Sequence, residues 1–309
     1  MAECTEDAAY AAFTKIIKKI EHQAKLLRIW NLQGGVSAQT TAVEFEAGGH
    51  CKRAVVRQYG EANLRSNSHI ARSEWKLLNL LHAAGIPVPK PYFADESANL
   101  LPAPYIVIEF IEGQTRTEPA DVHPLVRKMG DVLAKIHSHK FSEHDLSFLP
   151  AQEHAAASLI AARPAKLDDS LSEGRIRDTL EQVWPPPQKN KSALLHGDFW
   201  PGNLLWKVDQ IAAVIDWEDA GCGDPLSDFA NARLEILMFF GIESMNEFTR
   251  HYRSLMASLE YTNLPYWDLI AALRPAGRMS GFGLDRETLL KFRERHKRFV
   301  NQALDRLNL

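Results

Sequence analysis

Cysteine is scarce in this sequence, and the few cysteines that occur follow no recognisable pattern. Cys4, Cys51 and Cys222 are the three cysteines among 309 residues, and they lie far apart. They match neither a zinc-binding nor a thioredoxin-like spacing. Without a disulfide framework, the simplest expectation is a reducing, cytoplasmic setting.

Long apolar runs and a strong excess of positive charge are also missing. No stretch approaches the ~18 to 20 apolar residues needed to span a bilayer. The N-terminus carries Glu3, Glu6 and Asp7, where a signal peptide would be basic. The formal net charge of -3 argues against a dedicated nucleic-acid binder. We therefore expect a protein that binds neither nucleic acid nor a membrane.

The composition that remains is that of a globular protein with a sizeable core. Hydrophobic residues make up 45% of the chain and charged residues 24%, and the length suits one large or two ordinary domains. The P-loop motif Gly-x4-Gly-Lys-Ser/Thr does not occur. This excludes the P-loop NTPases, but not other nucleotide-binding folds.

The N-terminal third changes from a helical to a strand-like period. Apolar residues at three- and four-residue steps predict a helix over residues 6–28, and a three-stranded antiparallel meander follows over 29–59. A turn at Gly34 and Gly35 separates the first two strands. A glycine hairpin can present backbone N–H groups to phosphates, although most glycine pairs between strands are only turns.

A cation lies near the end of the third expected strand. Arg57 follows the apolar residues of that strand, and the helix predicted over 68–84 carries Glu74 in its first half. Arginine is bidentate and always charged, so it can hold phosphate, and Glu74 is a candidate to orient it. The alternative is that both are ordinary solvent-exposed charges.

Beyond this helix a buried strand and then a run of helices are expected. The apolar strand covers residues 105–111, and Glu112-Gly113 breaks it. By itself, this pattern indicates an ordinary core strand that ends in a turn. Helices are predicted over residues 122–139, 152–163, 170–184, 243–259, 264–279 and 286–307.

The most informative stretch places polar residues at the ends of short buried strands. The motif His-x-Asp-x4-Asn runs from His196 through Asp198 to Asn203, and a second apolar run over 212–215 ends at Asp216. Loops at strand ends commonly carry functional groups. Carboxylate and carboxamide oxygens are also the hard ligands that Mg²⁺ prefers.

This motif, followed by Ile-Asp-Trp-Glu, resembles the catalytic and metal loops of the aminoglycoside phosphotransferase and choline kinase branch of the protein kinase-like fold. The resemblance covers about residues 30–240 and implies an α+β, bilobal fold. It implies a small antiparallel-sheet N-lobe over 1–112 that binds nucleotide. A mostly helical C-lobe over 113–309 would then carry the catalytic and substrate-binding groups.

The resemblance further implies a kinase that transfers the γ-phosphoryl group of ATP, or of GTP, to a small-molecule hydroxyl with Mg²⁺. Asp198 would orient the hydroxyl and accept its proton, while Asn203 and Asp216 would hold the metal. The nucleotide contacts that it implies come from Gly34, Gly35, Ser37, Arg57, Glu74 and the backbone groups of Glu109 and Ile111.

Two further polar residues are expected to be structural. His196 has no second His or Cys spaced to share a metal with it, so we expect it to hold the loop backbone or Asp216 by hydrogen bonds. Asp228 follows a Gly-Asp-Pro turn, and we expect it to be a buried hydrogen-bond acceptor rather than a catalyst.

Other functions and the acceptor stay open at this point. Arg57 stands where the family normally has Lys, which favours a catalytically silent nucleotide-binding or scaffold protein as the alternative. A protein kinase fits less well, because no Ala-Pro-Glu segment follows Asp216. The acceptor could be an amine, an amino sugar or an antibiotic, and the oligomeric state is not determined.

Overall fold

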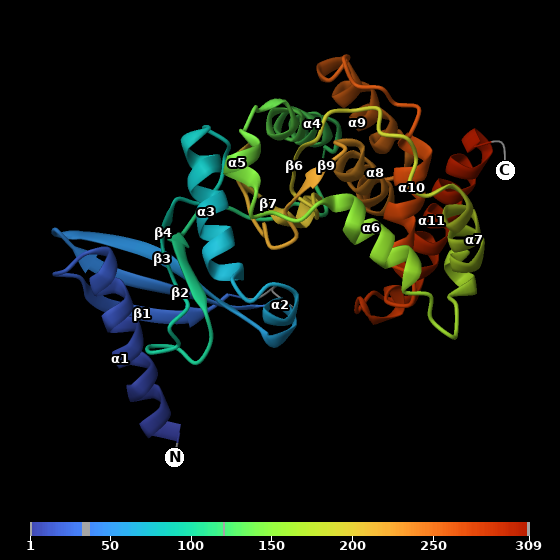
Figure 1. The fold of residues 1–309 in the computed structure, drawn as a ribbon. Helices are drawn as coiled ribbons and strands as arrows, with labels where there is room; N and C mark the ends of the chain where they lie inside the picture. Colours follow the sequence, from blue (N-terminus) through green and yellow to red (C-terminus); the bar gives the residue numbers. More distant parts are fainter. Residues whose placement is uncertain (1, 33–37, 120, 308–309) are drawn as a thin grey trace. The chain divides into compact units, whose positions relative to one another are not determined.

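The computed structural model describes residues 2–32, 38–119 and 121–307, and the chain forms two compact units (Figure 1). The first unit contains residues 1–112 together with 212–218, and the second contains 113–211 and 219–309. Residues 212–218 include the end of strand β8 (Gln210–Val214) and Asp216. A segment from the C-terminal half of the sequence is therefore packed into the N-terminal unit.

A five-stranded antiparallel sheet, with strand order β1-β2-β3-β5-β4, forms the first unit. Its first three strands are the meander expected from the sequence. Strand β5 is the expected strand over 105–111, although it ends at residue 109. The strands are β1 (Lys25–Asn31), β2 (Ala38–Ala47), β3 (His50–Tyr59), β4 (Pro91–Asp95) and β5 (Tyr105–Glu109).

The helix expected over 6–28 was wrong at its C-terminal end. Helix α1 (Ala2–Ile20) stops eight residues earlier, and β1 begins at Lys25. Leu27, which fitted the helical stripe, is 46% exposed, whereas Leu26 is buried and pairs with Phe45 of β2. Pairing with a neighbouring strand thus overrides the local helical period, which sequence periodicity alone does not reveal.

Strand β3 separates two environments, because successive side chains point to opposite faces of a sheet. Ala54 and Val56 belong to an apolar core that also contains Phe13, Ile16 and Ile17 of α1. Arg57 and Tyr59 alternate with these residues and therefore lie on the other face. Both are buried, at 9% and 1% exposure.

Helix α3 (Ile70–Ala83) supplies the carboxylate that meets this second face. It matches the helix predicted over 68–84. Glu74 precedes Leu77 by three residues and Leu78 by four, so all three share one face of the helix, and all three are buried. The helical period thus places a charged residue on an otherwise apolar inner stripe.

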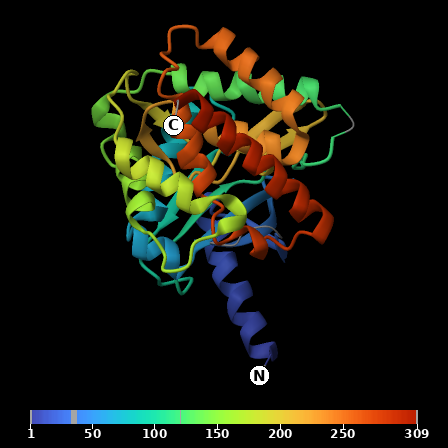
Figure 2. The same cartoon turned by 90° about the vertical axis from the view of Figure 1, so that its right-hand side faces the viewer.

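The second unit is mostly helical and contains the short antiparallel pair β6 (Ala193–Leu195) and β9 (Gly221–Gly223). Within it α4 packs against α9, and α10 packs against both α8 and α11. Figure 2 shows α11, in red, crossing the face of this unit that is turned to the viewer. Its long helices are α4 (His123–Ser138), α6 (Gln152–Ala161), α7 (Glu173–Val183), α8 (Leu226–Phe240), α9 (Ile242–Leu255), α10 (Leu264–Leu273) and α11 (Arg286–Leu307).

The helices predicted for this unit are confirmed. Most of them are shorter than expected, whereas α11 has the expected bounds. The largest difference is at α10, which was expected to continue to residue 279 but ends at Leu273. Arg274 and Pro275 follow directly. Arg274 still has helical backbone angles, but Pro275 has no backbone N–H with which to continue the helical hydrogen bonds. Of the helices in the described ranges, none has the length and apolar character that crossing a bilayer requires.

Candidate active site

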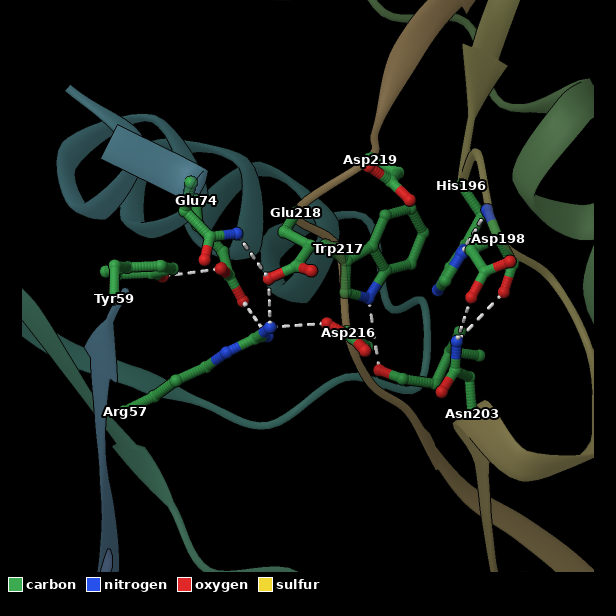
Figure 3. Close-up of polar contacts among 12 residues, drawn as sticks. Arg57, Tyr59, Glu74, His196, Asp198, Asn203, Asp216, Trp217, Glu218 and Asp219 are labelled. Atoms are coloured by element: carbon green, nitrogen blue, oxygen red, sulfur yellow. Dashed lines mark hydrogen bonds and ion pairs between the residues drawn. The ribbon is translucent and has the colours of Figure 1, made fainter. Parts of the chain in front are cut away.

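Arg57 is the centre of a charge cluster in the first unit (Figure 3). One of its terminal nitrogens donates to Glu74 Oε1 at 3.3 Å. The other donates to Asp216 Oδ1 and to Glu218 Oε2, at 2.5 Å each. The alternative of two solvent charges is therefore wrong for Arg57 and Glu74, which bind each other within the protein.

The same cluster contains two residues that the sequence did not single out. Tyr59 donates its hydroxyl hydrogen to Glu74 at 2.5 Å, and Asn63 donates to Glu218 at 3.0 Å. Burial works against the charge of Arg57, but the attraction of Glu74 and then of Asp216 outweighs it and raises the pKa of the guanidinium. For Tyr59, burial and then the charge of Glu74 raise the pKa of the phenol.

Asp216 reaches this cluster because the segment that carries it is held by backbone contacts. Val214 N–H donates to the carbonyl of Pro87 at 2.7 Å, and the Trp217 indole donates to the carbonyl of Val214 at 3.1 Å. Asp216 itself adopts a left-handed conformation with φ of 67°. A non-glycine residue in that region is uncommon and often marks a functional turn.

The cluster carries more negative than positive charge. One guanidinium faces the three carboxylates of Glu74, Asp216 and Glu218. The Asp216 side chain remains 36% exposed while Glu74 is only 3% exposed. An accessible carboxylate beside an excess of negative charge suits a hard divalent cation.

The other nucleotide contacts implied by the resemblance have mixed outcomes. Gly34, Gly35 and Ser37 lie outside the described residues. Glu109 ends β5, and its backbone N–H already donates to the carbonyl of Lys90 at 2.8 Å. Ile111 lies two residues beyond the strand and is partly buried. Their adenine contacts stay a prediction.

In the second unit, Asp228 holds the loop from His196 to Asp198 by hydrogen bonds to its backbone. The carboxylate of Asp228 accepts the backbone N–H of His196 at 2.6 Å and that of Gly197 at 2.9 Å. Burial disfavours its charge, but hydrogen bonds from His137 and from the backbone N–H of His196 favour it and lower the pKa of the carboxyl. The structural role expected for Asp228 is confirmed.

His196 also takes the backbone role expected for it. It is fully buried, and its Nδ1 accepts the N–H of Asp198 at 3.2 Å. Gly197, between the two, has φ of 82°, and a side chain there would overlap the backbone carbonyl of Asp219. Only glycine fits both conditions without moving the loop.

Asp198 and Asn203 are brought together, as their spacing in the sequence suggested. The Asn203 amide nitrogen donates to the Asp198 carbonyl at 2.9 Å and to Asp198 Oδ2 at 3.1 Å (Figure 3). This leaves the side-chain oxygen of Asn203 as the atom able to bind a cation. The Asp198 side chain is 35% exposed, so a ligand can reach it.

Arg274 and Glu235 complete this part of the site, and sequence reasoning missed both. Arg274 donates to Asp198 Oδ1 at 3.1 Å. Glu235 keeps some exposed surface, while its carboxyl group lies among protein atoms. Burial, and then the charge of Asp198, raise the pKa of Glu235 from 4.5 to about 7, against the opposing pull of Arg274. Neither residue falls in a motif, so no local signal could have found them.

An antiparallel sheet whose strand cation is held by a helix glutamate is the architecture of the protein kinase-like phosphotransferases, a class with an α+β fold. The family comparison agrees. The model of the phosphotransferase enzyme family that contains the aminoglycoside phosphotransferases matches residues 29–261, and the chain belongs to this family.

Similarity to individual proteins is more limited. The chain is 25% identical over 198 residues to acyl-CoA dehydrogenase family member 10 of Mus musculus, a match that covers 58% of this chain and 18% of that protein. The chain thus spans less than a fifth of the length of that relative. The activities of the longer protein therefore do not transfer to it.

Two solved structures show the same fold. Amicoumacin kinase in complex with AMP-PNP, Ca²⁺ and amicoumacin has a TM-score of 0.63 at 15% identity and covers 98% of this chain and 96% of its own. A thermostable mutant of aminoglycoside phosphotransferase APH(4)-Ia with ADP and hygromycin B has a TM-score of 0.61 at 17% identity. It covers 93% of this chain and 97% of its own.

Proposed function

We propose that this protein transfers the γ-phosphoryl group of ATP to a hydroxyl group of a small molecule, with Mg²⁺ as the divalent ion. Its sheet unit binds the nucleotide and its helical unit binds the acceptor. The structures with AMP-PNP or ADP and a bound antibiotic support this assignment through the shared fold. GTP remains an alternative donor to be tested beside ATP.

Arg57 is the proposed phosphate-binding cation. Its fork of donors is turned toward three carboxylates, and phosphate oxygens can replace the carboxylate of Asp216 as acceptors. Glu74, bound to Tyr59 on its other oxygen, then keeps the guanidinium oriented. Arginine can hold Glu74 and phosphate together, because its planar guanidinium presents several donors in fixed directions.

Asp198 is the proposed group that orients the acceptor hydroxyl and takes its proton as the transfer completes. A carboxylate has about four lone-pair positions, and Arg274 and Asn203 each occupy one. The side chain is 35% exposed, so an acceptor hydroxyl can reach it. Removing such a group typically lowers turnover by ~10² to 10⁴.

Asp216 and Asn203 carry donor atoms of the kind that magnesium prefers. Asp216 offers an accessible carboxylate and Asn203 a side-chain oxygen, and we propose that each contributes one ligand. Mg²⁺ is commonly bound by one or two protein oxygens, with phosphate oxygens and water as the others. When bound, the ion supplies charge neutralisation at the phosphates.

One observation carries this proposal: the buried sheet cation Arg57 is held by the helix carboxylate Glu74, within a cluster that also contains Asp216. To test it, MgATP and MgGTP are titrated into the protein by calorimetry, and acceptors are screened by coupled ADP release. Binding at millimolar concentrations or below is expected, with turnover on at least one hydroxyl compound. No nucleotide binding would refute the assignment.

A catalytically silent nucleotide-binding protein is the second candidate. It is favoured by the direct ion pair between Arg57 and Asp216, which occupies a proposed metal ligand. Slow ADP release without acceptor separates the two functions. An enzyme loses this release in Asp198→Asn while keeping its nucleotide affinity. If wild type and Asp198→Asn release ADP equally, and no faster than MgATP hydrolyses without protein, the protein is catalytically silent.

A further inference from the structure

Arg274 is a cation placed against Asp198 from a distant part of the chain. It directly follows α10, 76 residues from Asp198 in sequence. Apart from its contact with Asp198 Oδ1 at 3.1 Å, it donates to the carbonyl of Gly197 at 2.7 Å and to Asn231 Oδ1 at 2.9 Å. One side chain thus contacts two consecutive loop residues and helix α8.

The two oxygens of the Asp198 carboxylate are each held by a different donor. Arg274 holds Oδ1 and Asn203 holds Oδ2, both at 3.1 Å. Two donors on separate oxygens define the plane of a carboxylate, whereas one donor would leave it free to rotate. Asp228 binds the backbone N–H groups of His196 and Gly197, and these contacts do not fix the direction of the Asp198 side chain.

Arg274 also affects the pKa of a neighbouring carboxyl group. Glu235 lies near enough for the charge of Asp198 to raise its pKa, while Arg274 acts in the opposite direction. The Arg274 side chain is 30% exposed, and its second acidic neighbour, Asp219, is 4.0 Å away and 60% exposed. The half-buried guanidinium is therefore directed at the loop rather than at solvent.

We propose that Arg274 is a positioning residue for the transfer step: it fixes the direction of the Asp198 carboxylate toward the acceptor oxygen. This inference rests on the proposed function, in which Asp198 orients the acceptor. Arg274 acts through Asp198 and not on the nucleotide. Its loss should therefore lower kcat while the KM for ATP stays unchanged.

The test uses the full chain with MgATP and water as the acceptor, measured as ADP release. Arg274→Ala should lower kcat roughly 10- to 100-fold, the typical effect of misplacing a catalytic group by about 1 Å. Arg278→Ala is the matched control, because this exposed arginine lies four residues further on and its side chain donates to the backbone carbonyl of Arg274. It should leave kcat within about twofold of wild type.

Guanidinium ion separates positioning from mere structural support. Added far below denaturing concentrations, it should enter the space vacated in Arg274→Ala and restore part of kcat. It should not restore Arg274→Met, whose side chain fills that space. Wild-type turnover in Arg274→Ala, or a lower kcat that guanidinium leaves unchanged, would overturn the proposal.

Nucleotide affinity and folding distinguish this failure from failure of the proposed function. If the wild type neither binds MgATP nor releases ADP, the proposed function is wrong. If the wild type is active and Arg274→Ala does not fold, Asn231→Ala replaces it. That variant removes an anchor of the guanidinium and keeps the charge, so kcat should fall by a smaller factor. Unchanged kcat in a folded Asn231→Ala would then overturn the role of Arg274.

Discussion

Replacing Arg57 by methionine should expose how strongly the charge cluster of the first unit depends on one cation. Arg57→Met keeps much of the aliphatic volume but removes the cation that the carboxylates of Glu74, Asp216 and Glu218 share. The Arg57 side chain is 11% exposed and that of Glu74 only 3%. Water therefore cannot replace the lost contacts at Glu74.

The magnitude follows from the cost of a buried, unpaired charge. Removing one partner of a buried ion pair typically costs about 3–5 kcal/mol. The loss has an upper limit, because a buried carboxyl without a cation takes up a proton. With an ordinary glutamate pKa of about 4.3 and about 1.36 kcal/mol for each pH unit, protonation at pH 7 costs about 4 kcal/mol. We expect Arg57→Met to lose about 3–4 kcal/mol of unfolding free energy at that pH.

The same reasoning gives a pH dependence with a definite sign. In the variant, the folded state holds a proton that the unfolded chain binds only as the pH falls toward about 4.3. Folding then takes up a proton, so lowering the pH stabilises the variant relative to wild type. The deficit of about 4 kcal/mol at pH 7 should shrink to about 1 kcal/mol at pH 5.

Urea unfolding at both pH values measures these differences. Arg57→Lys, which keeps the charge, is the control for the loss of the cation. The double variant Arg57→Met/Glu74→Gln removes the buried carboxylate as well and should be more stable than Arg57→Met alone. A deficit below about 1 kcal/mol at pH 7, or one that does not change with pH, would refute the account of this cluster.

Two further predictions concern the second unit. Glu235 has its pKa raised from 4.5 to about 7, so its stabilising contribution is present at low pH and is lost as the pH rises through about 7. Glu235→Gln should remove up to about 3 kcal/mol of this pH dependence. Urea unfolding at a series of pH values checks it, and parallel curves for the two proteins would contradict it. Gly197→Ala should destabilise the protein by more than the ~1–2 kcal/mol expected from a left-handed backbone alone and should lower ADP release, because its side chain overlaps the carbonyl of Asp219. Gly49 has φ of 76°, and a Cβ built there would meet no atom within 4 Å apart from its chain neighbours. Gly49→Ala therefore measures the effect of the backbone conformation alone. It should destabilise the protein less than Gly197→Ala and leave ADP release unchanged.

Local features of the sequence anticipated much of this protein. The helices of the second unit follow from apolar spacing, because each helix must bury one stripe. Asp198 and Asn203 lie five residues apart, and a tight loop between two short strands is enough to bring them into contact. Glu74 falls on the buried face of α3 for the same periodic reason.

Features that depend on distant residues were not predictable in this way. The start of β1 depends on pairing with β2, so the helical period over 21–28 was misleading. Glu218 and Tyr59 join the Arg57 cluster only through the folded chain. Glu235 lies on α8 and Arg274 directly follows α10, and the pattern of both helices indicates only packing.

The order of residues along the chain determined the family, the candidate catalytic loop and most helices, because each depends on spacing within one element or turn. Tertiary structure alone decided that residues 212–218 pack with the N-terminal sheet and that Arg57 binds Asp216. It also decided that an arginine following α10 meets Asp198. Charges attract across space whatever their separation in sequence, and only the packed core decides which of them are brought within reach.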